Sequence, residues 1–320
     1  MSDTTAGEAL RHWNIKATEI HLIAQRENKV YQVTSTDGIK HALRIHRPGY
    51  QSIRAIQSEL LWMTHLKSKN LDVPIPLPTS KGDLVIHCKG HHCDLLSWLN
   101  GLPIGSSAEP LSNPDRLQTL KEIGRVMALL HIESDAWQAS PTFERPAWDS
   151  DGLLGDNALW GRFWENPGLT SGQQKLLLNT REQIIETLKY QSLDYGLIHA
   201  DLVPENILVS QTGIQLIDFD DSGFGYRLFD IATTLFKFRN EPDYLQLEHA
   251  LLAGYRSNRP IDTTTLPLFI LLRSLTYVGW IIPRMDEPGA DVRQHRFISN
   301  AIELAKAFTA TTPGHVKRAT

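Results

Sequence analysis

Three short apolar runs in the second half of the chain constrain the fold more than any other feature. Residues 197–199, 206–210 and 214–218 are rich in Ile, Leu and Val, yet each run is too short for a helix. They are therefore predicted to be short strands. Gln211-Thr212-Gly213 has the composition of a turn between the last two runs. The pattern predicts β-hairpin elements in this part of the chain.

Polar residues in and beside these runs have a spacing suited to phosphoryl transfer. The segment contains His199-x-Asp201 and then Asn206, and Asp218 ends the last run. Transfer from ATP to a hydroxyl requires a carboxylate that accepts the hydroxyl proton, and an amide oxygen and a second carboxylate that hold Mg²⁺. Asp201, Asn206 and Asp218 fit these roles in that order. The alternative is an ordinary loop and hairpin that carry these polar residues by chance. The hairpin favours a catalytic role because it would direct the three side chains into the same site.

Further segments carry a resemblance to a known family. They are Glu27–Tyr31, Ala42–Pro48, Trp148-Asp149 with Gly152–Gly155, and Phe229–Ala232. Together with the segment around Asp201 and Ile217–Asp220, they make the chain similar to the aminoglycoside phosphotransferase and choline kinase family. Within that family it most resembles bacterial type II homoserine kinases, hydroxylysine-kinase-like proteins and a stress-response kinase. The resemblance extends from about residue 18 to residue 305.

The resemblance implies a two-lobed protein-kinase-like fold of the α+β class. Residues 1–99 are expected to form a small antiparallel lobe that binds nucleotide. Its predicted strands are 18–24, 29–35, 40–46, 83–87 and 92–97, with one main helix at 53–66. Residues 100–320 are expected to form a mostly helical lobe that holds the catalytic hairpins and the acceptor. Its predicted helices are 113–132, 171–190, 228–238, 243–257, 263–282 and 291–308, and the tail from about 309 to 320 is expected to be mobile.

Nucleotide binding requires a cation for the α- and β-phosphates and an acid that orients it. Arg44 occupies the third predicted strand, where Lys is commoner, and Glu59 on the following helix is its natural partner. Arg can serve because its guanidinium stays charged and forks onto phosphate oxygens. The alternative for both residues is an ordinary solvated charge.

Two other segments are expected to contact the nucleotide. The loop 25–29, which includes Asn28, is not rich in glycine, although its backbone N–H groups could still cradle phosphate. The resemblance implies that the backbones of Ser97 and Leu99, in the connection between the lobes, hydrogen-bond the adenine.

Aromatic and charged residues suggest an acceptor with an amine and a carboxylate. The segment 148–165 begins with Trp148 and Asp149 and combines aromatic with acidic side chains, which suits an amine through cation–π and ionic contacts. Arg273 and Arg284 are predicted to share one helix face, being eleven residues apart, and Arg is well shaped for a carboxylate. The alternatives are plain packing for the tryptophans and helix salt bridges for the arginines.

Three more polar residues surround the motif. Asp220 would face the same way as Asp218 if the strand continues, so it is a candidate for the substrate, a second ion or a structural role. Asp230 opens a predicted helix and is interpreted as a helix cap or a brace for the catalytic loop. The resemblance implies that His199 also braces this loop.

The sequence therefore predicts an ATP- and Mg²⁺-dependent kinase that phosphorylates a hydroxyl of a small amino acid or amino alcohol. A protein Ser/Thr kinase of the stress-response type is an alternative, although no Ala-Pro-Glu follows Asp218. A non-catalytic ATP-binding pseudokinase remains open because of Arg44 and the glycine-poor loop, and so does antibiotic phosphorylation.

Composition limits the partners and the cellular location that can be expected for the protein. The net charge of −4 shows no excess of Lys and Arg that would bind the phosphate backbone, so nucleic acid is not an expected partner. The two cysteines, Cys88 and Cys93, are too few for a disulfide framework. The N-terminus has neither the basic nor the apolar region of a signal peptide. The longest apolar segment, 266–283, is interrupted by Arg273 and predicts a buried helix instead of a membrane span. We therefore expect a cytoplasmic protein.

Overall fold

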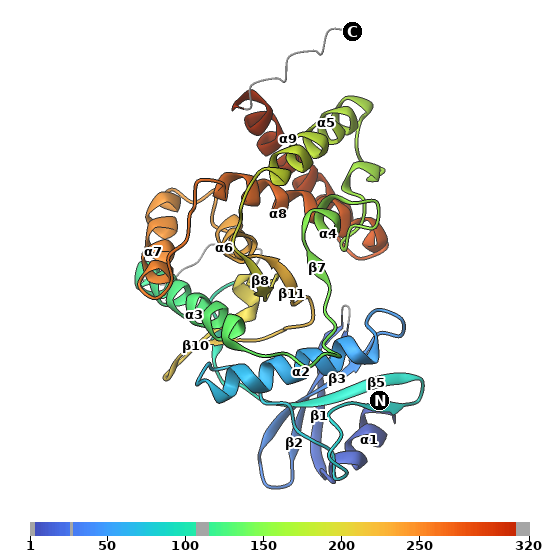
Figure 1. Cartoon of the computed structure of the whole chain (residues 1–320). Helices are drawn as coiled ribbons and strands as arrows, with labels where there is room; N and C mark the ends of the chain where they lie inside the picture. Colours follow the sequence, from blue (N-terminus) through green and yellow to red (C-terminus); the bar gives the residue numbers. More distant parts are fainter. Residues whose placement is uncertain (1–3, 26–27, 107–114, 312–320) are drawn as a thin grey trace. The chain divides into compact units, whose positions relative to one another are not determined.

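The chain folds into two compact units, each assembled from several segments. The computed structural model describes residues 4–25, 28–106 and 115–311 (Figure 1). The first unit consists of residues 1–145, 203–222 and 250–259, and the second of 146–202, 223–249 and 260–320. The first unit thus includes residues on both sides of the predicted lobe boundary, which stays a prediction. Most of the predicted tail, 312–320, lies outside the described residues.

A five-stranded antiparallel sheet opens the first unit. In spatial order its strands are β1 (Ala17–Gln25), β2 (Asn28–Ser35), β3 (Lys40–His46), β5 (His91–Ser97) and β4 (Ile86–Cys88). Helix α1 (Thr4–Leu10) and Trp13 cover one face, where Leu43 and Ile45 are buried. Because side chains alternate along a strand, Arg44 and His46 point to the other face of the sheet. This is the face on which Arg44 is predicted to contact the nucleotide.

Helix α2 (Ile53–Ser68) covers that other face of the sheet (Figure 1). Its N-cap is Ser52, whose side chain accepts a hydrogen bond of 3.0 Å from the N–H of Ala55. Ile56, Leu60, Met63 and Leu66 line its buried face, and Glu59 is buried with them at 0% exposure. A fully buried carboxylate requires a charged or hydrogen-bonding partner, and the structure supplies one on β3.

The predicted catalytic hairpin belongs to the first unit. It consists of β9 (Ile207–Ser210) and β10 (Gly213–Leu216), is preceded by the 3-10 turn Pro204–Asn206, and pairs with the short strand β6 (Leu102–Pro103). The hairpin is anchored to residues that follow the five-stranded sheet, because the N–H of Gly101 donates to the side chain of Gln215 over 3.0 Å. The predicted hairpin is therefore present, but its second strand ends at Leu216 and does not include Asp218.

Two helices of the first unit meet at glycines. Helix α3 (Arg116–Ala136) contacts the C-terminal half of α7 (Tyr244–Arg256). A Cβ atom on Gly254 would lie 1.8 Å from the carbonyl oxygen of Lys121, and one on Gly124 would lie 2.0 Å from that of Leu251. The absence of side chains at these two positions allows the helix backbones to approach.

We expect Gly254→Ala to lower the free energy of unfolding by about 1–3 kcal/mol, because the added methyl group overpacks the contact with α3. Urea denaturation would measure the change. Gly172→Ala is the matched control, since Gly172 is also helical and has no atom within 4 Å of an added Cβ. It should be neutral or slightly stabilising. Equal stability of the two variants would contradict the close approach of α3 and α7.

The second unit is mostly helical around a small sheet. Its strands are, in spatial order, β7 (Ala147–Trp148), β11 (Gly223–Tyr226) and β8 (Tyr195–Ile198). Its helices are α4 (Ser150–Leu154), α5 (Ser171–Lys189), α6 (Arg227–Phe236), α8 (Leu266–Trp280) and α9 (Ala290–Thr311), and the first half of α7 also belongs to it. Helix α8 packs against both α6 and α9 and is buried along nearly all of its length.

Burial of α8 agrees with the sequence interpretation of the segment 266–283. Among the residues that the structure describes, no helix is long and apolar enough to cross a membrane. The predicted helix 263–282 is present as α8, but the prediction that Arg284 shares a helix face with Arg273 is wrong. Helix α8 ends at Trp280, and Arg284 belongs to a separate 3-10 turn, Ile282–Arg284, that contains Pro283.

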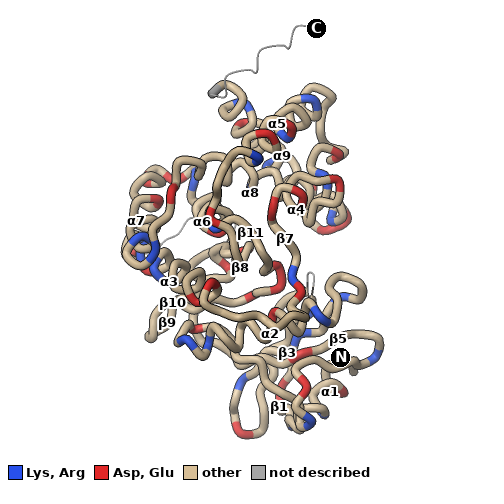
Figure 2. Tube along the Cα trace, viewed as in Figure 1, with Lys and Arg blue, Asp and Glu red and all other residues tan. Residues whose placement is uncertain are grey.

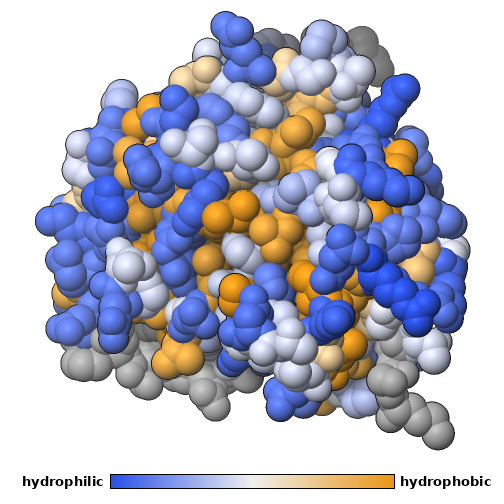
Figure 3. Space-filling view, turned by 90° about the horizontal axis from the view of Figure 1, so that it is seen from below, coloured by the Kyte–Doolittle hydropathy of each residue, from blue (hydrophilic) through white to orange (hydrophobic). Residues whose placement is uncertain are grey.

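Among the described residues, charged side chains of both signs are interspersed along both units (Figure 2). The face seen from below in Figure 3 is largely hydrophilic, with smaller groups of hydrophobic residues between the polar ones. Both cysteines, Cys88 and Cys93, are buried.

Candidate active site

The predicted pair of Arg44 and Glu59 is present in the first unit. The Nη1 atom of Arg44 lies 2.6 Å from Oε1 of Glu59, and both side chains are at most 5% exposed. Strand β3 and helix α2 therefore hold the pair from two sides. The expected role of Arg44 at the phosphates stays a prediction.

Asp94 on β5 is a member of this cluster that the sequence interpretation missed. It lies opposite Arg44 in the sheet and accepts from its Nε at 2.9 Å and from its Nη2 at 3.0 Å. Its second oxygen is 2.5 Å from Nε2 of His46. Burial alone would lower the pKa of Arg44, but Asp94 and Glu59 raise it well above its usual value. The signal in the sequence was one charged residue in the apolar strand Cys93–Leu96.

Asp94 also has a depressed pKa. Burial would raise it, but the charges of Arg44 and His46 outweigh burial and hold the pKa below the usual value. The carboxylate is consequently ionised and paired at neutral pH. Its charge balances the guanidinium of Arg44, whose side chain is only 5% exposed.

We expect Asp94→Asn to lower the free energy of unfolding by about 3–5 kcal/mol, because it removes one partner of a buried ion pair. Denaturant titration would measure the loss. The matched control is Asp135→Asn, whose partly exposed ion pair with Arg259 at 2.6 Å should contribute less than about 1 kcal/mol. An Asp94 variant as stable as this control would contradict the proposed charge balance.

Asn206 and Asp218, the predicted metal ligands, both belong to the first unit. The carbonyl oxygen of Asn206 accepts from the N–H of Ile217 over 3.0 Å, which ties the start of the hairpin to its end. Asp218 is exposed and has φ of +65°, a value uncommon for a residue with a side chain. Carboxylate and amide oxygens suit a hard cation such as Mg²⁺.

Asp220 does not continue a strand beside Asp218. It is 4% exposed, and burial, with the charge of Glu59, raises its pKa. His46, Arg44 and Arg145 act in the opposite direction. The condition of the same-face argument is not met, because the strand ends at Leu216 and the backbone turns at Asp218, and the substrate role of Asp220 stays a prediction.

The loop that holds the predicted catalytic residue Asp201 is braced by Asp230, as one sequence interpretation proposed. The N–H groups of His199 and Ala200 donate to the two carboxylate oxygens of Asp230 over 2.9 and 2.6 Å. Ala200 has φ of +68°. Thr234 adds a hydrogen bond of 2.8 Å to the carbonyl oxygen of Leu202. Helix α6 thus fixes the loop on both sides of Asp201.

Arg273 contacts Asp201 directly. Its Nη2 lies 2.5 Å from Oδ1 of Asp201 and 2.9 Å from the hydroxyl of Tyr277, and its Nη1 donates to the carbonyl oxygen of Ala200 over 3.3 Å. The guanidinium lies 4.6 Å from the ring centre of Trp160 and 4.5 Å from that of Tyr277. Burial would lower the pKa of Arg273, but Tyr277 and Asp201 raise it. Arg273 therefore orients the predicted catalytic carboxylate.

The other predicted acceptor residues have structural partners. Trp148 is 1% exposed and stacks on Phe229 with ring centres 5.4 Å apart. Asp149 caps α4, accepting from the N–H of Gly152 over 2.8 Å. Arg284 lies over the ring of Trp280 at 4.1 Å. Packing and capping account for these contacts, and the substrate roles stay predictions.

The remaining nucleotide predictions concern backbone segments. Asn28 is on β2, and its side chain accepts from the N–H of Arg47 over 3.4 Å, while residues 26–27 of the same loop lie outside the described residues. The N–H of Ser97 already donates to the carbonyl oxygen of Ile75 over 2.8 Å. Leu99 follows β5 and is half-buried. The adenine contacts of Ser97 and Leu99 stay predictions.

Comparison with known proteins decides the family. The family described as APH, phosphotransferase enzyme family, matches residues 19–261. The chain belongs to this phosphotransferase family. This phosphotransferase is 27% identical over 272 residues to a homoserine kinase of Agrobacterium fabrum, and the match covers 77% of its chain and 78% of the relative. It is 29% identical over 247 residues to a homoserine kinase of Sinorhizobium medicae, covering 71% and 68% of the two chains.

Solved structures confirm the predicted α+β, protein-kinase-like fold. A microcompartment-associated aminopropanol kinase has a TM-score of 0.83 and 28% identity, with 96% of this chain and 98% of the other covered. A choline kinase from Streptococcus pneumoniae has a TM-score of 0.65 and 15% identity, with 93% and 98% covered, and shows the fold alone. The predicted family is confirmed, and this phosphotransferase is a kinase that transfers phosphate to a hydroxyl.

Proposed function

We propose that this phosphotransferase moves the γ-phosphoryl group of ATP, with Mg²⁺, to the hydroxyl of a small amino alcohol or amino acid. The observation that carries the proposal is the arrangement around Asp201, whose carboxylate is held by the buried Arg273 and whose loop is held by Asp230. A carboxylate fixed in this way suits a group that accepts a hydroxyl proton. The proposal includes a cytoplasmic location, where ATP is available.

The first unit supplies the proposed nucleotide and metal groups. Arg44 would contact the phosphates while Glu59 and Asp94 orient its guanidinium. Asn206 and Asp218 would hold Mg²⁺. Mg²⁺ is usually bound by one or two carboxylates together with phosphate oxygens, so a small protein ligand set is sufficient. In the described part of the chain, no group of three or more His, Cys, Asp or Glu side chains could hold a metal by itself.

The acceptor class follows from the relatives and from chemistry. The similar proteins are named homoserine kinases and an aminopropanol kinase, and both named acceptors have a hydroxyl and an amine. Homoserine also has a carboxylate, which would need a cation. Because the guanidinium of Arg273 is committed to Asp201 and Tyr277, we favour an amino alcohol over an amino acid.

A coupled assay that detects ADP would test this function. With Mg²⁺ and ATP, the acceptors would be 1-amino-2-propanol, ethanolamine, choline, homoserine, threonine, hydroxylysine and an aminoglycoside. We expect turnover on the amino alcohols and its loss in Asp201→Asn. Turnover confined to the aminoglycoside, or phosphate incorporated only into added protein, would overturn the proposed acceptor class.

A further inference from the structure

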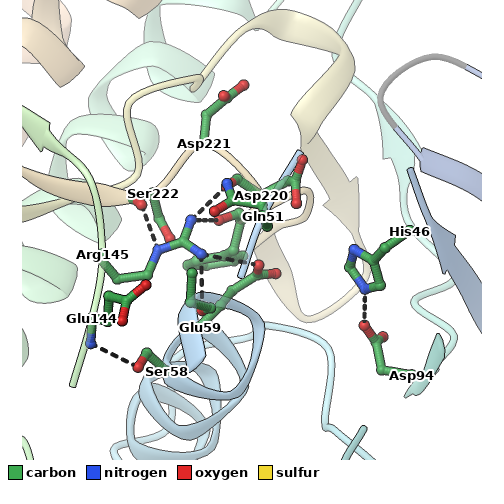
Figure 4. Close-up of polar contacts among 12 residues, drawn as sticks. His46, Gln51, Ser58, Glu59, Asp94, Glu144, Arg145, Asp220, Asp221 and Ser222 are labelled. Carbon is green, nitrogen blue, oxygen red and sulfur yellow. Dashed lines mark hydrogen bonds and ion pairs between the residues drawn. The ribbon is translucent and has the colours of Figure 1, made fainter. Parts of the chain in front are cut away.

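Arg145 is a buried arginine that the scheme above does not use. It lies two residues before β7, belongs to the first unit, and has a side chain that is 0% exposed. Its guanidinium lies between α2 and the segment 219–222 (Figure 4). Since a buried cation is costly unless it is fully hydrogen-bonded, the partners of Arg145 indicate what it does.

On one side Arg145 holds the backbone that follows Asp218. Its Nε donates to the carbonyl oxygen of Ser222 over 2.6 Å. Its Nη2 donates to the carbonyl oxygens of Asp220 and Phe219 over 2.5 and 3.3 Å. All three acceptors are main-chain atoms. The contacts therefore fix the path of the chain immediately after the proposed metal ligand.

On the other side Arg145 holds helix α2. Its Nη1 donates to the carbonyl oxygen of Ala55 over 3.1 Å and lies 3.5 Å from Oε2 of Glu59. The other oxygen of Glu59 binds Arg44 at 2.6 Å. Glu59 thus connects the two arginines, one expected at the phosphates and one on the metal-binding segment.

Neighbouring residues strengthen the same connection. Gln51 donates from Nε2 to the carbonyl oxygen of Asp220 over 3.1 Å. The N–H of Glu144 donates to Oγ of Ser58 on α2 over 2.9 Å (Figure 4). Ser52, the N-cap of α2, donates to the carboxylate of Glu144 over 2.5 Å. Residues 144–145 therefore bind α2 along two turns before they reach the segment 219–222.

The backbone conformation of Asp218 indicates what the contacts of Arg145 stabilise. A non-glycine residue with φ of +65° persists only where the surrounding structure determines it. The strand contacts of β10 end at Leu216, two residues before Asp218. The contacts of Arg145 begin at Phe219, one residue after it, so they define the backbone on that side.

We propose that Arg145 is a positioning residue for phosphoryl transfer, which holds the segment 219–222 on α2 and so sets Asp218 relative to the Arg44–Glu59 pair. This inference rests on the proposed function, because it takes Asp218 as the metal ligand. The planar fork of Arg reaches acceptors on both sides at once, whereas the single ammonium of Lys cannot.

The test compares Arg145→Lys, Arg145→Met and Gln51→Ala with wild type. Arg125→Met is the matched control, since Arg125 is 43% exposed and paired with Glu122 on its own helix. Calorimetry with AMP-PNP at several Mg²⁺ concentrations measures metal-dependent nucleotide binding without an acceptor. In Arg145→Lys we expect the Mg²⁺ concentration for half-maximal binding to rise about tenfold, as for other residues that orient metal ligands.

Turnover and hydrogen exchange complete the test. In Arg145→Lys, kcat should fall about a hundredfold from misplacement of the metal, with acceptor KM unchanged. Amide exchange should accelerate in a peptide covering 217–223. Gln51→Ala should change the Mg²⁺ requirement, kcat and the exchange rate in the same direction but by less. If the Arg145 variants do not fold, Gln51→Ala tests whether the contacts to segment 219–222 position Asp218.

One result would overturn the proposed role of Arg145, and a different result would overturn the proposed function. Variants that lose only thermal stability, with kcat and the Mg²⁺ requirement unchanged, would make Arg145 a purely structural residue and leave the proposed function standing. Wild-type protein that binds no magnesium nucleotide would overturn the proposed function itself.

Discussion

Replacing Asp201 by asparagine is expected to lower kcat by about 10²- to 10⁴-fold, the usual contribution of a general base. The side-chain amide of asparagine is nearly the same size as the carboxylate and still offers an oxygen to Arg273. In the wild-type protein this arginine lies 2.5 Å from the carboxylate. The fold should therefore persist while proton acceptance is lost. Steady-state kinetics on the best amino alcohol would measure the change.

The control for Asp201→Asn is Asp83→Asn, which removes one carboxylate from an exposed turn. It should match wild type in kcat and in thermal stability. If Asp201→Asn keeps more than about a tenth of wild-type kcat, Asp201 is not the general base. Circular dichroism of both variants would separate lost chemistry from lost folding.

Replacing Arg273 by methionine is expected to lower kcat about a hundredfold, because the catalytic carboxylate loses the group that orients it. Methionine fills much of the same volume between Trp160 and Tyr277, so the aromatic packing should largely remain. The lost hydrogen bonds should reduce the free energy of unfolding by about 1–3 kcal/mol. Kinetics and denaturant titration would measure both effects.

Acceptor dependence distinguishes two roles for Arg273. If it orients Asp201, kcat falls alike for 1-amino-2-propanol and homoserine, and neither KM changes. A rise in KM for homoserine alone would instead support the role predicted from the sequence, a direct contact with an acceptor carboxylate. Arg125→Met, at a residue 43% exposed and paired with Glu122, is the matched control and should leave both acceptors unaffected.

The sequence predicted what depends on local pattern. Alternation of apolar residues located the strands of the main sheet, and helical periodicity located α2 with its buried face. Family resemblance implied the fold, and it is confirmed. The pairing of Arg44 with Glu59 was also foreseen, since a cation on the third strand and an acid on the next helix are close in any such arrangement.

What the sequence did not predict depends on contacts between distant segments. Asp94 lies fifty residues from Arg44, and only the strand register brings them together. Arg145 acts through main-chain carbonyl oxygens, which leave no trace in the sequence. The error over Arg284 had a local cause, because Pro283 follows the end of α8 and places Arg284 in a separate turn.

The burial of both cysteines makes the protein a convenient object for spectroscopy. Cys93 is 0% exposed, Cys88 is 8% exposed, and burial raises the pKa of the Cys88 thiol. A thiol of this kind forms little thiolate at neutral pH and reacts slowly with maleimides. A single cysteine introduced at an exposed position could therefore be labelled selectively, without first removing the native ones, and used for fluorescence or spin-label measurements during turnover.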